Sequence, residues 1–189
     1  GYGPWMATTE SVMSATTSVV GAAGIVKNIV FKTELLPIAA TMLGAVSLTV
    51  SLLFLLVLML VSGHRVSWHV ALLPVIIGIH FLFVCAIGIW LAAINVFTRD
   101  LGQVLPNLLT VLMFVTPVFY SIESVPGPVA LASLANPFYV IVDAYRCVVV
   151  NHTLPAWHGL VYVALLGLLI LMTGLRAFRR VKGRFDSAL

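Results

Sequence analysis

Residues 38–62 read IAATMLGAVSLTVSLLFLLVLMLVS and contain no charged side chain. A helix of this length crosses a bilayer core of about 30 Å with some tilt. Ala40 and Gly44 are four residues apart, a spacing of small residues that favours close contact with another helix. The whole chain is 61% hydrophobic and 8% charged, whereas soluble domains carry about 25% charged residues. The sequence therefore predicts an integral membrane protein.

Other apolar runs extend this prediction along the chain. Residues 70–95, 101–120 and 159–178 are each expected to span the membrane, and residues 1–24 are expected to be the end of a further span. The chain starts without methionine, so we expect an upstream part to be missing. The fold class predicted is all-α, a polytopic transmembrane helical bundle in a single domain over residues 1–189.

Two polar side chains lie inside apolar runs. Glu10 is expected to face protein or a cavity, because a carboxylate at mid-membrane costs about 3 kcal/mol on insertion scales. A functional role remains open for Glu10, and so does an ion-paired or surface-facing carboxylate. His80 is interpreted as a hydrogen-bonding residue between helices in preference to a proton carrier.

Residues 25–37 form a charged interval with helical amphipathicity. At 100° per residue, the apolar side chains fall within an arc of about 140°. The polar side holds four residues: Lys27, Asn28, Lys32 and Glu34. A helix of this kind lies flat on a membrane surface. Phe31 and Leu35 are neighbours among these charges, which indicates contact with another protein, although a plain interfacial loop is the alternative.

The distribution of basic residues predicts the orientation. Alternating spans place residues 25–37, residues 95–100 and the C-terminus on one side, with the basic run that begins at Arg176 and continues into the tail at residues 179–189. That side holds eight of the ten Lys and Arg residues, and the other side holds Arg65 and Arg146. Because cytoplasmic loops are enriched in Lys and Arg, the amphipathic segment is predicted to be cytoplasmic.

Residues 121–150 precede the last span and do not form a simple loop. The run at residues 138–150 is too short and too charged to cross a bilayer, so we expect re-entrant or interfacial helices packed against protein. Asn136 before Pro137 is a good N-terminal cap. Asp143 and Arg146 are three residues apart and can pair on one helix face.

No enzyme signature is found in the sequence. It contains no G-x-x-x-x-G-K-[ST] loop, so we expect no ATP hydrolysis by this chain. The five histidines form no metal-binding pair at i,i+4, and Cys85 and Cys147 are interpreted as packing residues. The net charge of +4 is too small and too dispersed to indicate nucleic acid. A transporter, channel or scaffold remains.

Several ordered motifs resemble those of polysaccharide-export ABC transporter permeases over essentially the whole chain. The motifs are residues 25–37, NVFTRD at residues 95–100 with Pro106, TPVFY at residues 116–120, NPF at residues 136–138 with Arg146, and FRR at residues 178–180. The family usually has Pro-Arg where Lys32-Thr33 stands here, so the angle of this helix or its partner contact differs. By this resemblance the first span and part of the second are missing.

The resemblance implies a six-span subunit of the bacterial inner membrane that dimerises, binds separate ABC ATPase subunits and exports a lipid-linked glycan, such as O-antigen, capsule or a teichoic-acid-like polymer. ATP and Mg would bind the ATPase, and this chain would bind no cofactor or metal and have no catalytic residue. A permease of the same architecture that exports drugs or small lipids is the alternative, and a non-transporting scaffold is a third possibility.

The resemblance also implies roles for particular residues. Residues 25–37 would be a cytoplasmic coupling helix, and residues 121–150 a periplasmic gate region with short re-entrant helices. The ATPase-coupling candidates are Lys27, Asn28, Phe31, Lys32, Glu34, Leu35, Arg99 and Asp100. The gate or translocation-path candidates are Pro117, Phe119, Tyr120, Asn136, Pro137 and Arg146. Aromatic side chains that could line a sugar path, or simply pack, are Phe81, Phe83, Trp90, Phe114, Phe119 and Tyr120.

Overall fold

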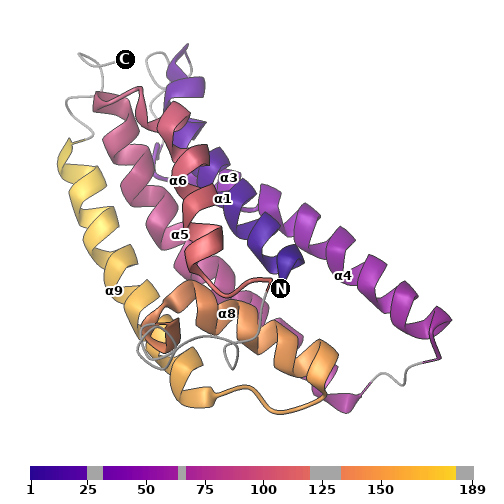
Figure 1. The fold of residues 1–189 in the computed structure, drawn as a ribbon. Helices are drawn as coiled ribbons and strands as arrows, with labels where there is room; N and C mark the ends of the chain where they lie inside the picture. The colour runs from indigo at the N-terminus through magenta and orange to yellow at the C-terminus, as the bar shows by residue number, and fades with distance from the viewer. Residues whose placement is uncertain (25–31, 64–66, 120–132, 182–189) are drawn as a thin grey trace.

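The computed structural model describes residues 1–24, 32–63, 67–119 and 133–181, and this part of the chain is helical without strands (Figure 1). The elements in chain order are α1 (Tyr2–Gly21), α3 (Leu35–Thr41), α4 (Leu43–Val61), the 3-10 helix η1 (Trp68–Leu72), α5 (Leu73–Phe97), α6 (Leu101–Val115), α8 (Pro137–Arg146), the π-helix η3 (Cys147–Asn151) and α9 (Trp157–Val181).

Three helical stretches are long and apolar enough to cross a membrane: Leu35–Val61, Trp68–Phe97 and Trp157–Val181. They confirm the prediction of an all-helical membrane protein. α6 is apolar but shorter than the run at residues 101–120. It ends at Val115 because Thr116 precedes Pro117 and takes an extended conformation, with ψ of 131°. Residues before proline are disfavoured in the helical region.

α5 lies between α1 and α9 and packs against both (Figure 1). Its buried side chains include Phe83 and Ile89. α9 approaches it closely through two glycines seven residues apart. A Cβ on Gly167 would lie 3.2 Å from the Cα of Phe83, and one on Gly174 would lie 2.8 Å from the Trp90 ring. The glycines therefore allow the two helices to approach more closely than larger residues would.

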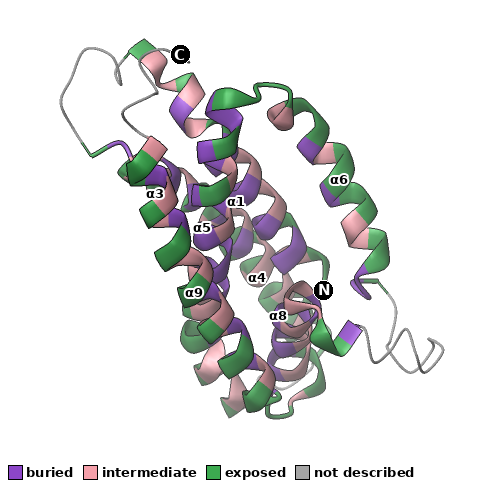
Figure 2. Ribbon diagram, turned by 90° about the vertical axis from the view of Figure 1, so that its left-hand side faces the viewer, coloured by how far each residue is buried: buried purple, intermediate pink, exposed green. Residues whose placement is uncertain are grey.

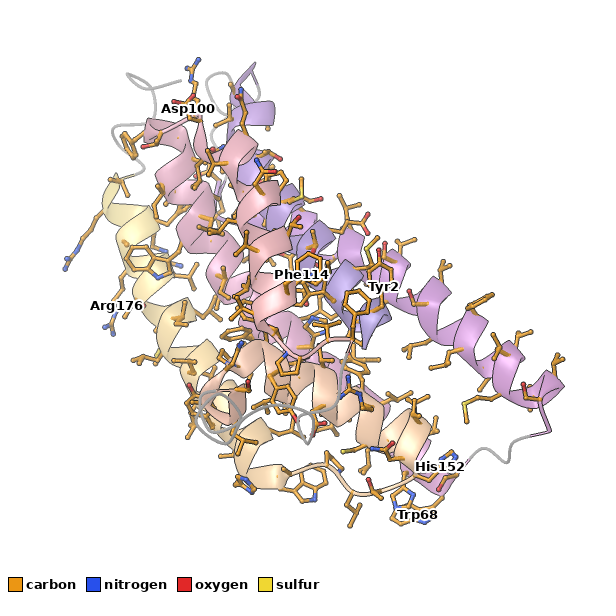
Figure 3. The ribbon with its side chains drawn as sticks, viewed as in Figure 1. Tyr2, Trp68, Asp100, Phe114, His152 and Arg176 are labelled. Carbon is orange, nitrogen blue, oxygen red and sulfur yellow. The ribbon has the colours of Figure 1, made fainter. Side chains whose placement is uncertain are left out.

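Different segments of the chain lie at the two ends of the bundle. The turn at Asp100 lies at the same end as the C-terminal end of α9, whereas Trp68 and His152 lie at the other end (Figure 3). α8 lies beside these last two residues and packs against α1, α5 and α9. This arrangement agrees with the alternation of spans used to predict the orientation. We refer below to the Asp100 end and the Trp68 end.

The helical stretch Leu35–Val61 is broken at Met42. The Ser11 hydroxyl of α1 donates to the Thr41 carbonyl at 2.7 Å. In a regular helix the Thr41 carbonyl would accept from the Ala45 amide, four residues later. Here the Ala45 amide donates to the Met42 carbonyl, at 3.0 Å, so the i→i−4 bond between Ala45 and Thr41 is absent. Insertion of a side chain into the helical ladder is a known cause of kinks. As a result, α3 packs against α1 and α5, while the far part of α4 leaves the bundle (Figure 1).

Candidate functional site

An ion pair at the Asp100 end joins two segments that are distant in sequence. Arg179 Nε of α9 lies 3.4 Å from Glu34 Oε1, immediately before α3. The Glu34 side chain is 12% exposed and that of Arg179 is 66% exposed. The contact therefore attaches the end of residues 25–37 to the last helix.

The predicted coupling residues gather at this end as far as the structure describes them. Lys32, Arg99 and Asp100 are exposed, and Leu35 is an exposed apolar side chain. Three others, Lys27, Asn28 and Phe31, lie outside the described residues.

Two polar atoms beside this ion pair are buried without a hydrogen-bond partner in the described part of the chain. They are Thr33 Oγ1 and Glu34 Oε2. A buried polar group without a partner costs about 1–3 kcal/mol. This cost favours a further polar contact at the start of α3, beyond the Arg179 pair.

The Glu34–Arg179 pair leads to a prediction about stability. Because Arg179 is mostly exposed, Arg179→Ala is expected to lower the free energy of unfolding by no more than about 1 kcal/mol. Arg179→Glu should lower it further by placing two carboxylates together, and Glu34→Arg with Arg179→Glu should recover most of the loss. Thermal unfolding of the four proteins in one detergent measures this. A double variant as unstable as Arg179→Glu alone would contradict the pairing.

At the Trp68 end, α8 holds the segment that follows α6. The Asn136 carboxamide oxygen accepts from the Phe138 amide at 3.0 Å, so the predicted N-cap is confirmed. Its Nδ2 donates to Thr116 Oγ1 at 3.0 Å. At the other end of α8, Arg146 Nη2 donates to the carbonyls of Pro117, at 3.4 Å, and Val118, at 3.0 Å. Both ends of α8 therefore bind residues 116–118.

The predicted ion pair between Asp143 and Arg146 is wrong. The Arg146 guanidinium turns to the two carbonyls after α6, and Asp143 Oδ2 accepts instead from Cys147 Sγ at 3.7 Å. Pro117 and Val118 lie in a non-helical segment, so their carbonyl oxygens are open to a cationic donor. Arg146 thus acts through backbone contacts, which its spacing from Asp143 could not reveal.

The aromatic candidates divide into two groups. Phe81 and Phe83 are buried, and Trp90 Nε1 donates to the Ile170 carbonyl of α9 at 3.2 Å, so packing explains these three. Phe114 and Phe119 are exposed, and Phe119 stacks on Tyr2 with ring centroids 5.6 Å apart. Tyr120 lies outside the described residues.

α6 carries an exposed polar row that we did not single out from the sequence. It packs on the bundle through Leu105 and Leu109, while Gln103, Asn107 and Thr110 are exposed. Spacings of four and three residues place these three on one helix face. Polar side chains in membrane segments generally face protein or a water-filled cavity, because lipid chains cannot satisfy them. Their periodicity within the apolar run was the signal available in the sequence.

These features define a polytopic α-helical membrane protein with an exposed polar row on α6 and with side-chain contacts between distant segments at each end. Residues 5–150 match the family model described as ABC-2 type transporter, and the chain belongs to that family.

Similar proteins cover nearly all of the chain. It is 28% identical to the O-antigen export system permease protein RfbA of Myxococcus xanthus, over 98% of this chain and 72% of that protein. It is 24% identical to two proteins of the same name from Klebsiella pneumoniae, over 100% of this chain and 73% of each. The family and the apolar helices together indicate a multi-pass protein of the bacterial inner membrane that acts as a transport subunit and not as an enzyme. Family membership also implies an ABC ATPase as partner.

Proposed function

We propose that this chain is the permease subunit of an ABC exporter that moves a lipid-linked polysaccharide across the inner membrane. The similarity to three O-antigen export permeases over almost the whole chain supports this substrate class. The energy comes from the hydrolysis of ATP, which the separate ATPase binds together with Mg, and this chain binds neither. Two copies of the chain form the path for the glycan.

The polar row on α6 is the structural observation that carries the proposal. Gln103 and Asn107 offer carboxamides that both donate and accept. The Thr110 oxygen, whose proton goes to the Pro106 carbonyl, can accept, and such groups form hydrogen bonds with sugar hydroxyls. A path for drugs or small lipids would be lined mainly by apolar groups. The row lies on a helix that stands at the side of the bundle (Figure 2), where a second copy would enclose it. The same helix leads into residues 116–119, the proposed gate.

Removing the polar row is therefore expected to reduce glycan export. Asn107→Leu with Thr110→Val should lower export about tenfold, since the two groups together contribute on the order of 1–2 kcal/mol. Thr49→Val is the matched control, because Thr49 is also exposed and also donates to its own i−4 carbonyl, as Thr110 does. Surface display of the glycan in cells lacking the native permease is the measurement. Unchanged display with the double variant would contradict the role of α6, and export of a drug instead would favour the alternative.

Coupling to the ATPase is proposed to use residues 25–37, Arg99 and Asp100. Leu35 is 52% exposed at the start of α3, an apolar side chain available to a partner. α3 contacts α1 through the bond from Ser11 to Thr41, so a push on Leu35 reaches both helices.

The coupling proposal predicts that the ATPase binds at Leu35 and not at an exposed leucine of the opposite end. Leu35→Asp is expected to reduce co-purification of the ATPase about tenfold or more, because it places a charge in an apolar contact. Phe31→Asp is the companion variant. Leu154→Asp is the matched control, since Leu154 is 55% exposed and lies close in sequence to His152 at the opposite end. Equal ATPase recovery with Leu35→Asp and Leu154→Asp would rule out docking at Leu35.

A further inference from the structure

Three helices, α1, α5 and α8, meet in a buried junction built of two layers. One layer is aromatic: Phe138 of α8 lies 5.8 Å from Trp5 of α1 and 5.4 Å from Phe83 of α5, between ring centroids. The other layer is polar and joins Thr8, His80 and Tyr145, one residue from each of the same helices. His80 is 1% exposed.

The polar layer is a continuous chain of hydrogen bonds with His80 in the middle. His80 Nε2 lies 2.8 Å from Thr8 Oγ1, and His80 Nδ1 lies 3.2 Å from the Tyr145 hydroxyl. The prediction that His80 hydrogen-bonds between helices is therefore confirmed. Its two partners, on two different helices, were not foreseen.

The direction of these bonds follows from Thr8. Its hydroxyl donates to the Pro4 carbonyl at 2.9 Å, so its single proton is used and its oxygen accepts from His80 Nε2–H. A neutral imidazole protonated at Nε2 then accepts at Nδ1 from the Tyr145 hydroxyl. One tautomer satisfies every polar atom of the layer, which is what a buried site of this kind requires.

We propose that His80 is the positioning residue that fixes α8 relative to α1 and α5. Tyr145 directly precedes Arg146, whose guanidinium binds the carbonyls of Pro117 and Val118. Anchoring Tyr145 therefore determines where Arg146 lies, and with it the segment after α6. The proposal rests on the proposed function only in that this segment is taken as the gate.

The junction also connects the two ends of the bundle through α1. Ser11, one helical turn from Thr8, donates to the Thr41 carbonyl of α3 at the Asp100 side. Thr8 reaches α8 through His80. A displacement of α3 is thus passed to α8 by two hydrogen-bonded contacts on neighbouring turns of one helix.

Amide hydrogen exchange in residues 137–146 tests the positioning role in the full-length permease bound to its ATPase. His80→Phe, Thr8→Val and Tyr145→Phe are each expected to raise the exchange rates in α8 about fivefold, the effect of one lost buried hydrogen bond on a docking equilibrium. His80→Asn should restore slow exchange in part, because its carboxamide oxygen can accept from Tyr145. Glycan export should follow the same order.

Thr173→Val is the matched control. Thr173, like Thr8, donates to its own i−4 carbonyl, and it also accepts from a ring nitrogen of α5, that of Trp90. It belongs to the α5–α9 contact, so the variant should leave exchange in α8 unchanged. A general loss of stability would instead raise exchange equally in both threonine variants and would overturn the proposal.

A spectroscopic readout and the exchange readout separate this inference from the choice of substrate. In ¹⁵N spectra of labelled histidine, His80 should show an unprotonated Nδ1 and a protonated Nε2, and Tyr145→Phe should shift the Nδ1 signal. Neither measurement requires a glycan, so each decides the positioning role even if the transported substrate is of another class. A protonated Nδ1 or unchanged exchange in the three variants would overturn it. Faster exchange in α8 without any loss of transport would instead overturn the role of residues 116–118 as the gate.

Discussion

Gly44→Leu is expected to remove most of the folded permease from the membrane. A Cβ at this position would fall onto the Ser11 side chain and the Ala7 carbonyl of α1, and the second of these is backbone that cannot move aside. Overpacking of a tight contact costs about 1–3 kcal/mol or more, against a total stability of roughly 5–15 kcal/mol. The larger leucine would also separate Ser11 from Thr41 and Glu10 from Ser47, two contacts that bracket Gly44.

Gly78→Leu is the control for this substitution. Gly78 lies within α5, as Gly44 lies within α4, but a Cβ there would meet no atom within 4 Å. We expect Gly78→Leu to accumulate normally and Gly44→Ala to lie between the two leucine variants. The amount of monodisperse protein extracted from membranes measures all three. Equal accumulation of the two leucine variants would show that close approach at Gly44 is not required.

Arg146→Leu is expected to abolish most transport while leaving the protein in the membrane. The guanidinium donates to two carbonyls at the end of α6, and a hydrogen bond to a charged group contributes about 1.5–3 kcal/mol. Losing these bonds frees residues 116–118 from α8 at one end, which corresponds to at least a tenfold loss of export. The Asn136–Thr116 bond remains and keeps the other end attached.

The lysine variant distinguishes geometry from charge at this position. A lysine ammonium is a compact point charge without the planar fork of arginine, so Arg146→Lys should recover little export. Arg176→Lys is the matched control, because Arg176 is exposed on α9 and points away from the bundle (Figure 3). Glycan display, normalised to permease level, is the measurement. Full activity of Arg146→Lys would indicate that only the charge matters.

The three long apolar helices and the cap of α8 were predictable because each depends on local sequence. A run of apolar residues as long as residues 38–62 has no stable place outside a bilayer. The Asn136 side chain caps its helix by accepting from the Phe138 amide, only two residues further along the chain. The interhelical role of His80 was also predictable, since a polar ring within an apolar run needs a polar partner.

Other features depend on contacts between distant residues and were not predictable. The Asp143–Arg146 pair was expected from spacing, but Arg146 found carbonyls 28 and 29 residues away. The break at Met42 requires Ser11, a residue 30 positions before Thr41. Thr8 and Tyr145 are likewise 72 and 65 residues from His80. Spacing rules describe neighbours on one helix, and these contacts cross between helices.

The break at Met42 has a consequence for the lipid environment of the protein. Leu35–Val61 comprises 27 residues, which as a straight helix would measure about 40 Å, whereas the hydrocarbon core measures about 30 Å. An unbroken helix of that length would have to tilt as a whole to fit, whereas the interrupted hydrogen-bond ladder at Met42 allows α4 to take a different tilt from α3. A thinner bilayer would increase the tilt of α4 and leave the α1–α3 contact in place. Transport by this protein should consequently change little with acyl-chain length, whereas in a permease with an unbroken helix the change of tilt would also move the segment that corresponds to α3.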